Sequence, residues 1–413
     1  MPTLGILVGG GPAPGINGVI GAAAIEAINE GCSVVGLYDG YRWLARGDST
    51  HAVSLRIEDV SRIHWTGGSI LRTARTNPAQ DATTLANCVA ALRALHITHL
   101  LCIGGDDTTF GAAKIAEATG GTVHVATVPK TIDNDLPLPD NMPTFGFETA
   151  RAVGAGIVET LMEDARTTQR WYLVISMGRK SGALALGITK AAGATLAVIP
   201  EQFEGPGLSL ALIADVIVGS MIKRAVSGTN HGVAVIAEGI AERLHESDFA
   251  GMHDAPRDPY GHIRLSEVDV GSVLKHAVMT RLKELRLEID VVTKDVGYEL
   301  RCAKPLPFDV EYTRTLGYGA VRYLLGGGSG AMVALRGGHV TPVPLQDMID
   351  PESGRIRVRL VDTTTEAYEV SRKYTIRLDG ADLEQPRLGP LAAKVGLTPN
   401  EFRSRFAAAA KTL

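Results

Sequence analysis

The sequence predicts a doubly wound, Rossmann-like α/β fold with parallel-rich sheets, and two observations carry this prediction. Several apolar runs are long enough for a buried strand and too short for a helix. Longer helical stretches, punctuated by glycine, lie between several of these runs. Such alternation is typical of parallel strands joined by crossover helices. The length of 413 residues favours two domains over one.

The expected elements follow from these patterns in chain order. The apolar segments LGILVG, THLLCI, TVHVATV, WYLVIS, GVAVIAE and AMVALR predict strands at 4–9, 98–103, 122–128, 171–176, 232–238 and 331–336. The helical stretches predict helices at 16–30, closed by Gly31, and at 82–96, 108–119, 146–166 and 267–286. Near the C-terminus, GRIRVRLVD at 354–362 alternates basic and apolar residues as an edge strand does. The C-terminal residues are therefore expected to form an accessory layer.

Charge, cysteine content and hydropathy exclude several classes of protein. The 41 basic and 45 acidic residues give a net charge of −4, so no broad basic face indicates nucleic acid or a membrane as a partner. The N-terminal MPTLGILVGG lacks the features of a secretory signal, and no apolar run has membrane-spanning length, so a cytoplasmic location is expected. The four cysteines, Cys32, Cys88, Cys102 and Cys302, form no C-x-x-C pair, which argues against zinc or redox chemistry.

The loops that follow strands deserve the closest inspection, because ligands of doubly wound folds collect at the carboxyl ends of the strands. The first such loop is GGGPAPGIN at 9–17. Its glycines let the main chain approach a phosphate, and the following helix N-terminus offers free N–H groups. Pro14 replaces the third glycine of the dinucleotide fingerprint, and the chain lacks the Gly-Lys of a P-loop. By itself, this loop fits a phosphate contact and a tight turn equally well.

Two further loops carry carboxylates at the same predicted sheet edge. They are GGDDT at 104–108 and PKTIDND at 129–135. Adjacent aspartates are commonly solvated turn residues or helix caps. A magnesium phosphate, however, needs oxygen ligands, and an attacking hydroxyl needs a base. Two acidic loops together with Lys130 therefore favour phosphoryl transfer.

Two loops of the second half of the chain offer groups for a sugar phosphate. In MGRKSG at 177–182, Arg179 is suited to a two-pronged contact with a phosphate. In AEG at 237–239, Glu238 is suited to accept hydrogen bonds from sugar hydroxyls. The alternatives are a surface arginine in a turn and an acidic residue that caps a strand.

Together these motifs resemble those of the 6-phosphofructokinases. The five loops and YELRCAKPLPFD at 298–309 occur in the order and approximate spacing of that family, over residues 4 to about 335. ATP-dependent members typically show G-G-D-G and P-G-T-I-D-N-D, whereas this chain has Asp107 and Lys130 at the variable positions. In this respect it resembles the pyrophosphate-dependent branch. The resemblance implies reversible transfer of a phosphoryl group from pyrophosphate to the 1-hydroxyl of fructose 6-phosphate, with Mg²⁺ as cofactor.

The resemblance also assigns roles to individual residues. It implies Asp133 as the base, Asp106 as the Mg²⁺ ligand, and Lys130, Asp107 and Arg179 as further catalytic residues. Donor contacts are implied for Gly11, Arg75, Asp107 and Lys130. Substrate contacts are implied for Thr131, Asp135, Arg170, Met177, Gly178, Arg179, Glu238, Tyr298 and Arg301. Asp107 would project into the space of a nucleotide's α-phosphate, where two like charges about 4 Å apart repel by roughly 4 kcal/mol at an effective dielectric near 20.

The family also implies a domain layout and an assembly. A large donor-binding domain is expected at 1–145 plus about 300–340, a small sugar-phosphate domain at about 146–299, and a C-terminal extension at about 341–413. The active site is expected in the cleft between the two domains. Because family members send an arginine at the position of Arg170 to a neighbouring subunit, a homodimer or homotetramer with shared sites is expected.

The sequence departs from the family at several positions. Tyr298 stands where many ATP-dependent members have histidine, and Val292 replaces a second neighbour-subunit arginine, for which Lys294 is a candidate substitute. Gly21 and Ile25 stand where bacterial ATP-dependent members carry arginines that bind nucleotide effectors. Nucleotide regulation of that kind is therefore not expected. Two alternatives remain open: an ATP-dependent 6-phosphofructokinase that tolerates Asp107, and a catalytically silent subunit that binds sugar phosphate.

Overall fold

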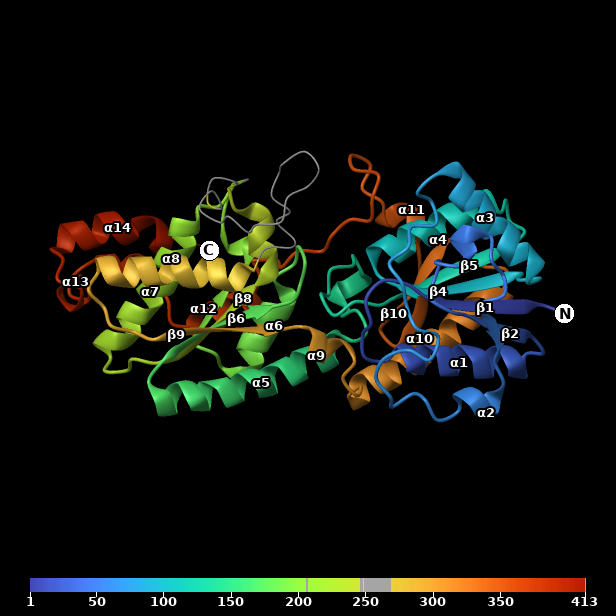
Figure 1. The fold of residues 1–413 in the computed structure, drawn as a ribbon, viewed down its shortest axis with the longest axis horizontal. Helices are drawn as coiled ribbons and strands as arrows, with labels where there is room; N and C mark the ends of the chain where they lie inside the picture. Colours follow the sequence, from blue (N-terminus) through green and yellow to red (C-terminus); the bar gives the residue numbers. More distant parts are fainter. Residues whose placement is uncertain (206, 246–247, 249–268, 413) are drawn as a thin grey trace. The chain divides into compact units, whose positions relative to one another are not determined.

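The chain folds into two compact units in a computed structural model that describes residues 1–205, 207–245, 248 and 269–412 (Figure 1). Unit 1 comprises Met1–Ala150 and Tyr298–Arg359, and unit 2 comprises Arg151–Gly297 and Leu360–Leu413. Each unit has its own sheet and its own buried core. Within the described residues, no helix combines the length and the apolar character that a membrane span requires.

Unit 1 contains a seven-stranded sheet in the order β11-β10-β5-β4-β1-β2-β3. The central pairs are parallel, whereas β11 and β3 are antiparallel at the two edges. The strands are β1 (Thr3–Val8), β2 (Ser33–Leu37), β3 (Ala52–Ser54), β4 (His99–Gly104), β5 (His124–Pro129), β10 (Ala331–Arg336) and β11 (His339–Pro344).

Helices cover both faces of this sheet. On one face, α1 (Ile16–Asn29) and α10 (Pro307–Leu325) pack over Leu101 and Ile103 of β4. On the other face, α3 (Ala82–Ala94) and α4 (Asp106–Ala118) pack over Leu100 and Cys102. The remaining helical segments of unit 1 are α2 (Ile57–Val60), α9 (Tyr298–Arg301), α11 (Leu345–Met348) and the short 3₁₀ segments Leu44–Arg46 and Pro139–Asn141. Successive residues of β4 thus face opposite cores, as the doubly wound prediction requires.

Unit 2 contains a parallel sheet in the order β7-β8-β6-β9. Its strands are β6 (Trp171–Ser176), β7 (Leu196–Val198), β8 (Gly232–Ala237) and β9 (Val291–Val296). Its helices are α6 (Ala183–Ala192), α7 (Leu210–Val226), α8 (Val270–Glu284), α12 (Glu366–Lys373), α13 (Leu388–Lys394) and α14 (Pro399–Lys411), with 3₁₀ segments at Pro200–Gln202, Glu238–Arg243 and Gly380–Leu383. The long helix α5 (Phe147–Thr168) starts in unit 1 and continues into unit 2.

The six strands predicted from apolar runs and the five predicted helices are confirmed, with boundaries that differ by a few residues. The strand expected at 171–176 coincides with β6, and the helix expected at 108–119 starts two residues earlier, at Asp106. The helix expected at 267–286 is α8, and residues 267 and 268 of that prediction lie outside the described residues.

The edge strand predicted at 354–362 is wrong. Ile356 forms only an isolated antiparallel bridge with Ile349. The side chains of Arg357 and Arg359 donate to main-chain carbonyls of unit 1, so this segment follows loops instead of pairing with a strand. Residues 341–359 belong to unit 1 and residues 360–413 to unit 2, where Phe402 of α14 is fully buried.

Candidate active site

The carboxyl ends of three neighbouring strands bring three predicted loops of unit 1 together. In the sheet, β4 lies between β1 and β5. The main-chain N–H of Gly9 donates to Ile103 O at 3.0 Å, and that of Lys130 donates to Gly104 O at 3.0 Å. The glycine loop, the Asp106–Asp107 pair and the loop that starts at Lys130 therefore lie side by side.

The glycine loop is tightly built against its neighbours. Gly10 has a φ of +81°, a conformation that favours glycine. A Cβ atom on Gly9 would lie 2.3 Å from Thr108 Oγ1, so the loop approaches the start of α4 as only glycine allows. Thr73 Oγ1 donates to Gly10 O at 2.6 Å. These contacts leave a fixed main chain beside a helix N-terminus, which is the usual framework for binding a phosphate.

Two cationic side chains, Lys130 and Arg301, lie close to Gly11. Lys130 Nζ donates to Gly11 O at 2.5 Å. A Cβ atom on Gly11 would lie 3.3 Å from Arg301 Cζ, which shows how closely that guanidinium covers the loop. Arg301 Cζ also lies 5.2 Å from the centroid of the Tyr298 ring, which is 79% exposed. The structure therefore brings together Gly11, Lys130, Tyr298 and Arg301, which the sequence assigned to donor and substrate binding.

Lys130 is a buried cation among carboxylates. Its side chain is 4% exposed. Burial lowers the pKa of Lys130 to about 8, the nearby Asp133 opposes this shift, and Arg301 adds to it. Asp135 and Asp106 also favour the protonated form. At neutral pH the side chain therefore remains mostly protonated, although it loses its proton at a lower pH than an ordinary lysine, and an anionic phosphate beside it would favour the charged form.

The loop after Lys130 buries two further acids. Asp133 and Asp135 are 7% and 6% exposed. The Asp133 N–H donates to Thr131 Oγ1 at 3.0 Å, and Thr144 Oγ1 donates to Thr131 O at 2.7 Å. The candidate base thus lies in a loop that is held by hydrogen bonds, near the ammonium of Lys130.

The aspartate pair begins α4. Asp106 is partly buried and Asp107 is exposed. Both lie in the first turn of the helix, where negative charges interact favourably with the helix dipole. Within the described residues, no group of three His, Cys, Asp or Glu side chains forms a metal cage. Mg²⁺ is usually held by one or two carboxylates together with substrate phosphates, so the single carboxylate Asp106 fits a metal that arrives with a phosphate donor. Arg75 is exposed and follows Ala74, whose carbonyl accepts from Gly10 N at 3.0 Å.

In unit 2, the predicted sugar-phosphate residues surround the end of β6. Glu238 Oε1 accepts from Gly178 N at 3.2 Å and from Arg179 N at 3.1 Å. Met177 N donates to Val296 O at 3.0 Å. Arg179 has a left-handed φ of 44° and an exposed side chain. Glu238 therefore holds the main chain of the loop that presents the Arg179 guanidinium.

Arg170 is not part of this group. It precedes β6, whereas Met177–Arg179 follow it, and six strand residues span about 20 Å. Gly232 N donates to Arg170 O at 3.3 Å, the Arg170 side chain interacts with Tyr172, and its buried Nε has no hydrogen-bond partner among the described residues. Arg170 and the predicted residues Met177–Arg179 thus lie at opposite ends of β6.

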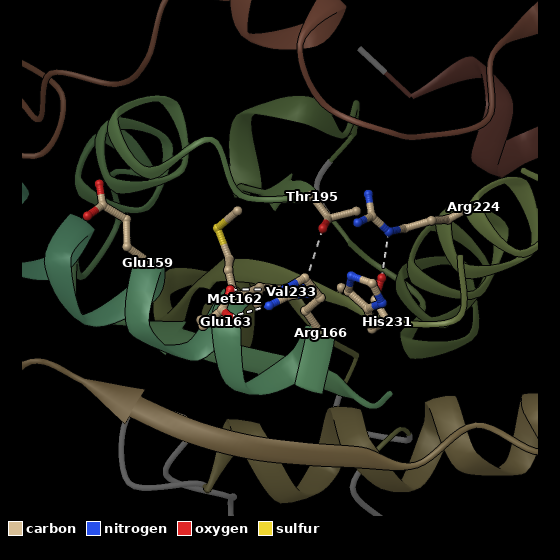
Figure 2. A pocket seen from close by; sticks show the side chains of 9 residues that line it. Glu159, Met162, Glu163, Arg166, Thr195, Arg224, His231 and Val233 are labelled. Atoms are coloured by element: carbon tan, nitrogen blue, oxygen red, sulfur yellow. Dashed lines mark hydrogen bonds and ion pairs between the residues drawn. The ribbon is translucent and has the colours of Figure 1, made fainter. Parts of the chain in front are cut away.

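Unit 2 contains a cavity of about 330 Å³ whose lining includes none of the predicted site residues (Figure 2). Arg224 Nε donates to His231 O at 2.5 Å, and Arg166 pairs with Glu163 at 2.5 Å. Burial lowers the pKa of His231, and Arg224 and Arg166 add to this shift. His231 directly precedes β8 and Val233 lies near its amino end, whereas Glu238 follows its carboxyl end, so this cavity is separate from the predicted loops.

Sequence reasoning missed two residues that hold site loops. Glu201 Oε1 accepts from Gly182 N at 2.9 Å, at the end of the MGRKSG loop. Arg359 donates to Asn134 O at 3.0 Å in the loop that carries Asp133. Neither residue belongs to a motif, because a side chain that binds a distant main-chain atom leaves no local pattern in the sequence.

Sequence and structure comparisons find proteins that are similar to this chain. The family model described as Phosphofructokinase matches residues 3–324. A pyrophosphate–fructose 6-phosphate 1-phosphotransferase of Thermotoga maritima is 52% identical over 98% of this chain and 97% of its own length. A protein of the same name from Naegleria fowleri is 46% identical over 98% of this chain and 95% of its own length. The crystal structure of a pyrophosphate-dependent phosphofructokinase from Marinobacter aquaeolei is 17% identical, covers 96% of this chain and 92% of its own, and shares the fold with a TM-score of 0.66.

Proposed function

The chain belongs to the phosphofructokinase family, and from this premise we propose that it transfers a phosphoryl group reversibly from pyrophosphate to the 1-hydroxyl of fructose 6-phosphate. The products are fructose 1,6-bisphosphate and phosphate. The observation that carries the donor assignment is the buried Lys130, whose Nζ donates to Gly11 O within the glycine loop. A small donor without a nucleoside needs such a charge contact close to its phosphates.

The donor half of the reaction belongs to unit 1. The main chain of the glycine loop and the start of α4 would bind pyrophosphate, and Lys130 would stabilise the charge that develops on the leaving phosphate. Asp106 would hold Mg²⁺, which neutralises phosphate charge when bound. Asp107, exposed in the first turn of α4, would repel the α-phosphate of ATP by roughly 4 kcal/mol, or about three orders of magnitude in affinity.

The acceptor half needs a base and a site for the sugar phosphate. Asp133 would remove the proton from the 1-hydroxyl as the oxygen attacks phosphorus. Further donor and sugar-phosphate contacts would come from Gly11, Arg75, Thr131, Asp135, Arg170, Met177, Gly178, Arg179, Glu238, Tyr298 and Arg301. The enzyme would act in the cytoplasm as a homodimer or homotetramer in which Arg170 serves a neighbouring subunit.

The test is the donor preference of four proteins. We measure kcat/KM with pyrophosphate and with ATP for the parent, Asp107→Gly, Lys130→Gly and the double variant. The parent should prefer pyrophosphate, Asp107→Gly should gain weak ATP use, and Lys130→Gly should lose at least about 100-fold with pyrophosphate. The effects should not simply add, because both residues act on one donor. A parent that prefers ATP would refute the donor assignment.

A further inference from the structure

The loop that carries the candidate base has little regular structure of its own. In residues 130–142, the only helical segment is the 3₁₀ turn Pro139–Asn141. Asn134, which separates Asp133 from Asp135, has a left-handed φ of 56°, a conformation that asparagine adopts more readily than most residues but at a higher cost than glycine. A loop in this conformation depends on partners elsewhere in the fold.

Arg359 supplies several of these partners. Its Nε donates to Asn134 O at 3.0 Å, its Nη1 donates to Met142 O at 2.9 Å, and its Nη2 donates to Asn134 Oδ1. Its main-chain N–H donates to Asp135 O at 2.7 Å. One side chain therefore ties two distant points of the loop together. Arg359 lies beyond residues 3–324, the part of the chain that matches the family model.

The chemistry of these contacts requires arginine. The two carbonyls and the amide oxygen are reached by different nitrogens of one planar guanidinium, which offers five donors in a rigid fork. A lysine ammonium has no such fork. Burial lowers the pKa of Arg359, while the neighbouring Asp135 favours its charged form, so the guanidinium also places a positive charge beside the acidic loop.

We propose that Arg359 is a positioning residue that holds Asp133 in the geometry needed to remove the acceptor proton. The inference rests on the proposed function and concerns the acceptor side of that reaction. Asp133 is the direct neighbour of Asn134, so a shift of the Asn134 main chain displaces the carboxylate. A displacement of about 1 Å at a catalytic group costs on the order of 100-fold in rate.

The experiment compares Arg359→Ala, Arg359→Lys and the control Arg357→Ala with the parent. Arg357 belongs to the same segment, and its hydrogen bonds within the described residues go to Asp347 O and Met348 O. We expect kcat to fall about 100-fold in Arg359→Ala, with both KM values within about threefold of the parent. Arg359→Lys should retain intermediate activity. Arg357→Ala should behave like the parent.

Chemical rescue separates positioning from a general loss of stability. Guanidinium chloride at tens of millimolar should occupy the vacated space in Arg359→Ala and restore kcat at least about tenfold, without changing the parent or Arg357→Ala. The proposal would be overturned if Arg359→Ala folds and keeps the parental kcat. It would also be overturned if guanidinium does not raise the kcat of folded Arg359→Ala. If Arg359→Ala fails to fold, a parental kcat in Arg359→Lys would overturn it. The assay uses whichever donor the parent accepts, so a wrong donor assignment is visible in the parent alone.

Discussion

The two units hold their site residues in opposite ways. In unit 1, Lys130, Asp133 and Asp135 are almost completely buried, and their charges act on one another. In unit 2, the Arg179 side chain is exposed, and Glu238 acts on the main chain of the loop that carries it. The proposed site residues of unit 1 are thus mainly buried charges, whereas the proposed sugar-phosphate loop of unit 2 is held by hydrogen bonds to its main chain.

This difference indicates which structural feature costs folding free energy in each unit. Burying a charge costs free energy unless partners compensate for it, so unit 1 gains chemistry at the expense of stability. In unit 2 the cost is a left-handed backbone at Arg179. Substitutions in unit 1 should therefore affect the chemical step and the stability, whereas substitutions in unit 2 should mainly affect substrate binding.

The largest effect is expected for the base. Asp133→Asn should lower kcat about 10²–10⁴-fold, because the amide cannot accept the hydroxyl proton, while the sugar phosphate still binds. Steady-state kinetics and calorimetric titration with fructose 6-phosphate measure the two quantities separately. Turnover within a few-fold of the parent would remove Asp133 from the mechanism and weaken the contrast between the units.

Lys130→Met should lower kcat/KM with pyrophosphate at least about 100-fold and yet stabilise the protein at pH 7. The folded-state pKa of about 8 is below the ordinary lysine value of 10.5, so the folded chain binds fewer protons than the unfolded chain between these pH values. The burial penalty is complete below pH 8, at roughly 3 kcal/mol, and disappears as pH rises to 10.5. Denaturant unfolding of both proteins from pH 7 to 10.5 should show the stability difference shrinking as pH rises.

The protonation state of Lys130 should also determine how the activity of the enzyme depends on pH. Since the ammonium carries the charge contact, activity of the parent should decline as pH rises through about 8, or somewhat higher when pyrophosphate is bound. Two results together would contradict this interpretation: Lys130→Met is no more stable than the parent at pH 7, and its activity declines at alkaline pH as the activity of the parent does. Lys130 would then not be a buried cation that acts in catalysis.

Much of the fold was predictable because buried strands form continuous apolar runs. Strand β6, with every residue buried, was predicted residue for residue. Strand β9 was missed because it lies at the edge of its sheet and exposes Lys294 and Asp295, which breaks the run. The segment around Arg359 was predicted wrongly because its alternation of basic and apolar residues has two explanations. An edge strand shows this pattern, and so does a loop whose arginines donate hydrogen bonds to main-chain carbonyls.

The proximity of the donor loops was also predictable, because adjacent parallel strands end at the same edge. The hydrogen bond from Lys130 to Gly11 O was not, since a contact between a side chain and a main-chain carbonyl depends on the fold and not on the residue at the accepting position. For the same reason, Glu238 was predicted as a sugar ligand while its hydrogen bonds to Gly178 and Arg179 were not foreseen.

A smaller effect is expected in unit 2. Glu238→Gln keeps an accepting oxygen but removes the charge that strengthens its bonds to Gly178 N and Arg179 N. The loss should be about 1–2 kcal/mol, seen as a roughly tenfold higher KM for fructose 6-phosphate with kcat and the pyrophosphate KM little changed. A kcat loss as large as that of Asp133→Asn would break the division between a chemical unit and a binding unit.

The smallest expected effect is the activity of mixed variants, which tests whether one chain supplies all residues of the proposed sugar-phosphate site. Arg170 lies at the opposite end of β6 from Met177–Arg179, and in the described part of the chain its buried Nε has no hydrogen-bond partner. If Arg170 completes a site in a neighbouring subunit, mixing Arg170→Ala with Asp133→Asn should restore activity, because a mixed dimer contains one site with both residues intact. Random pairing would give about one quarter of the parent activity. Mixtures no more active than the separate variants, with subunit exchange shown by mass spectrometry, would mean that Arg170 does not complete a neighbour's site, and the unit 2 half would then be confined to the loops at the carboxyl end of its own sheet.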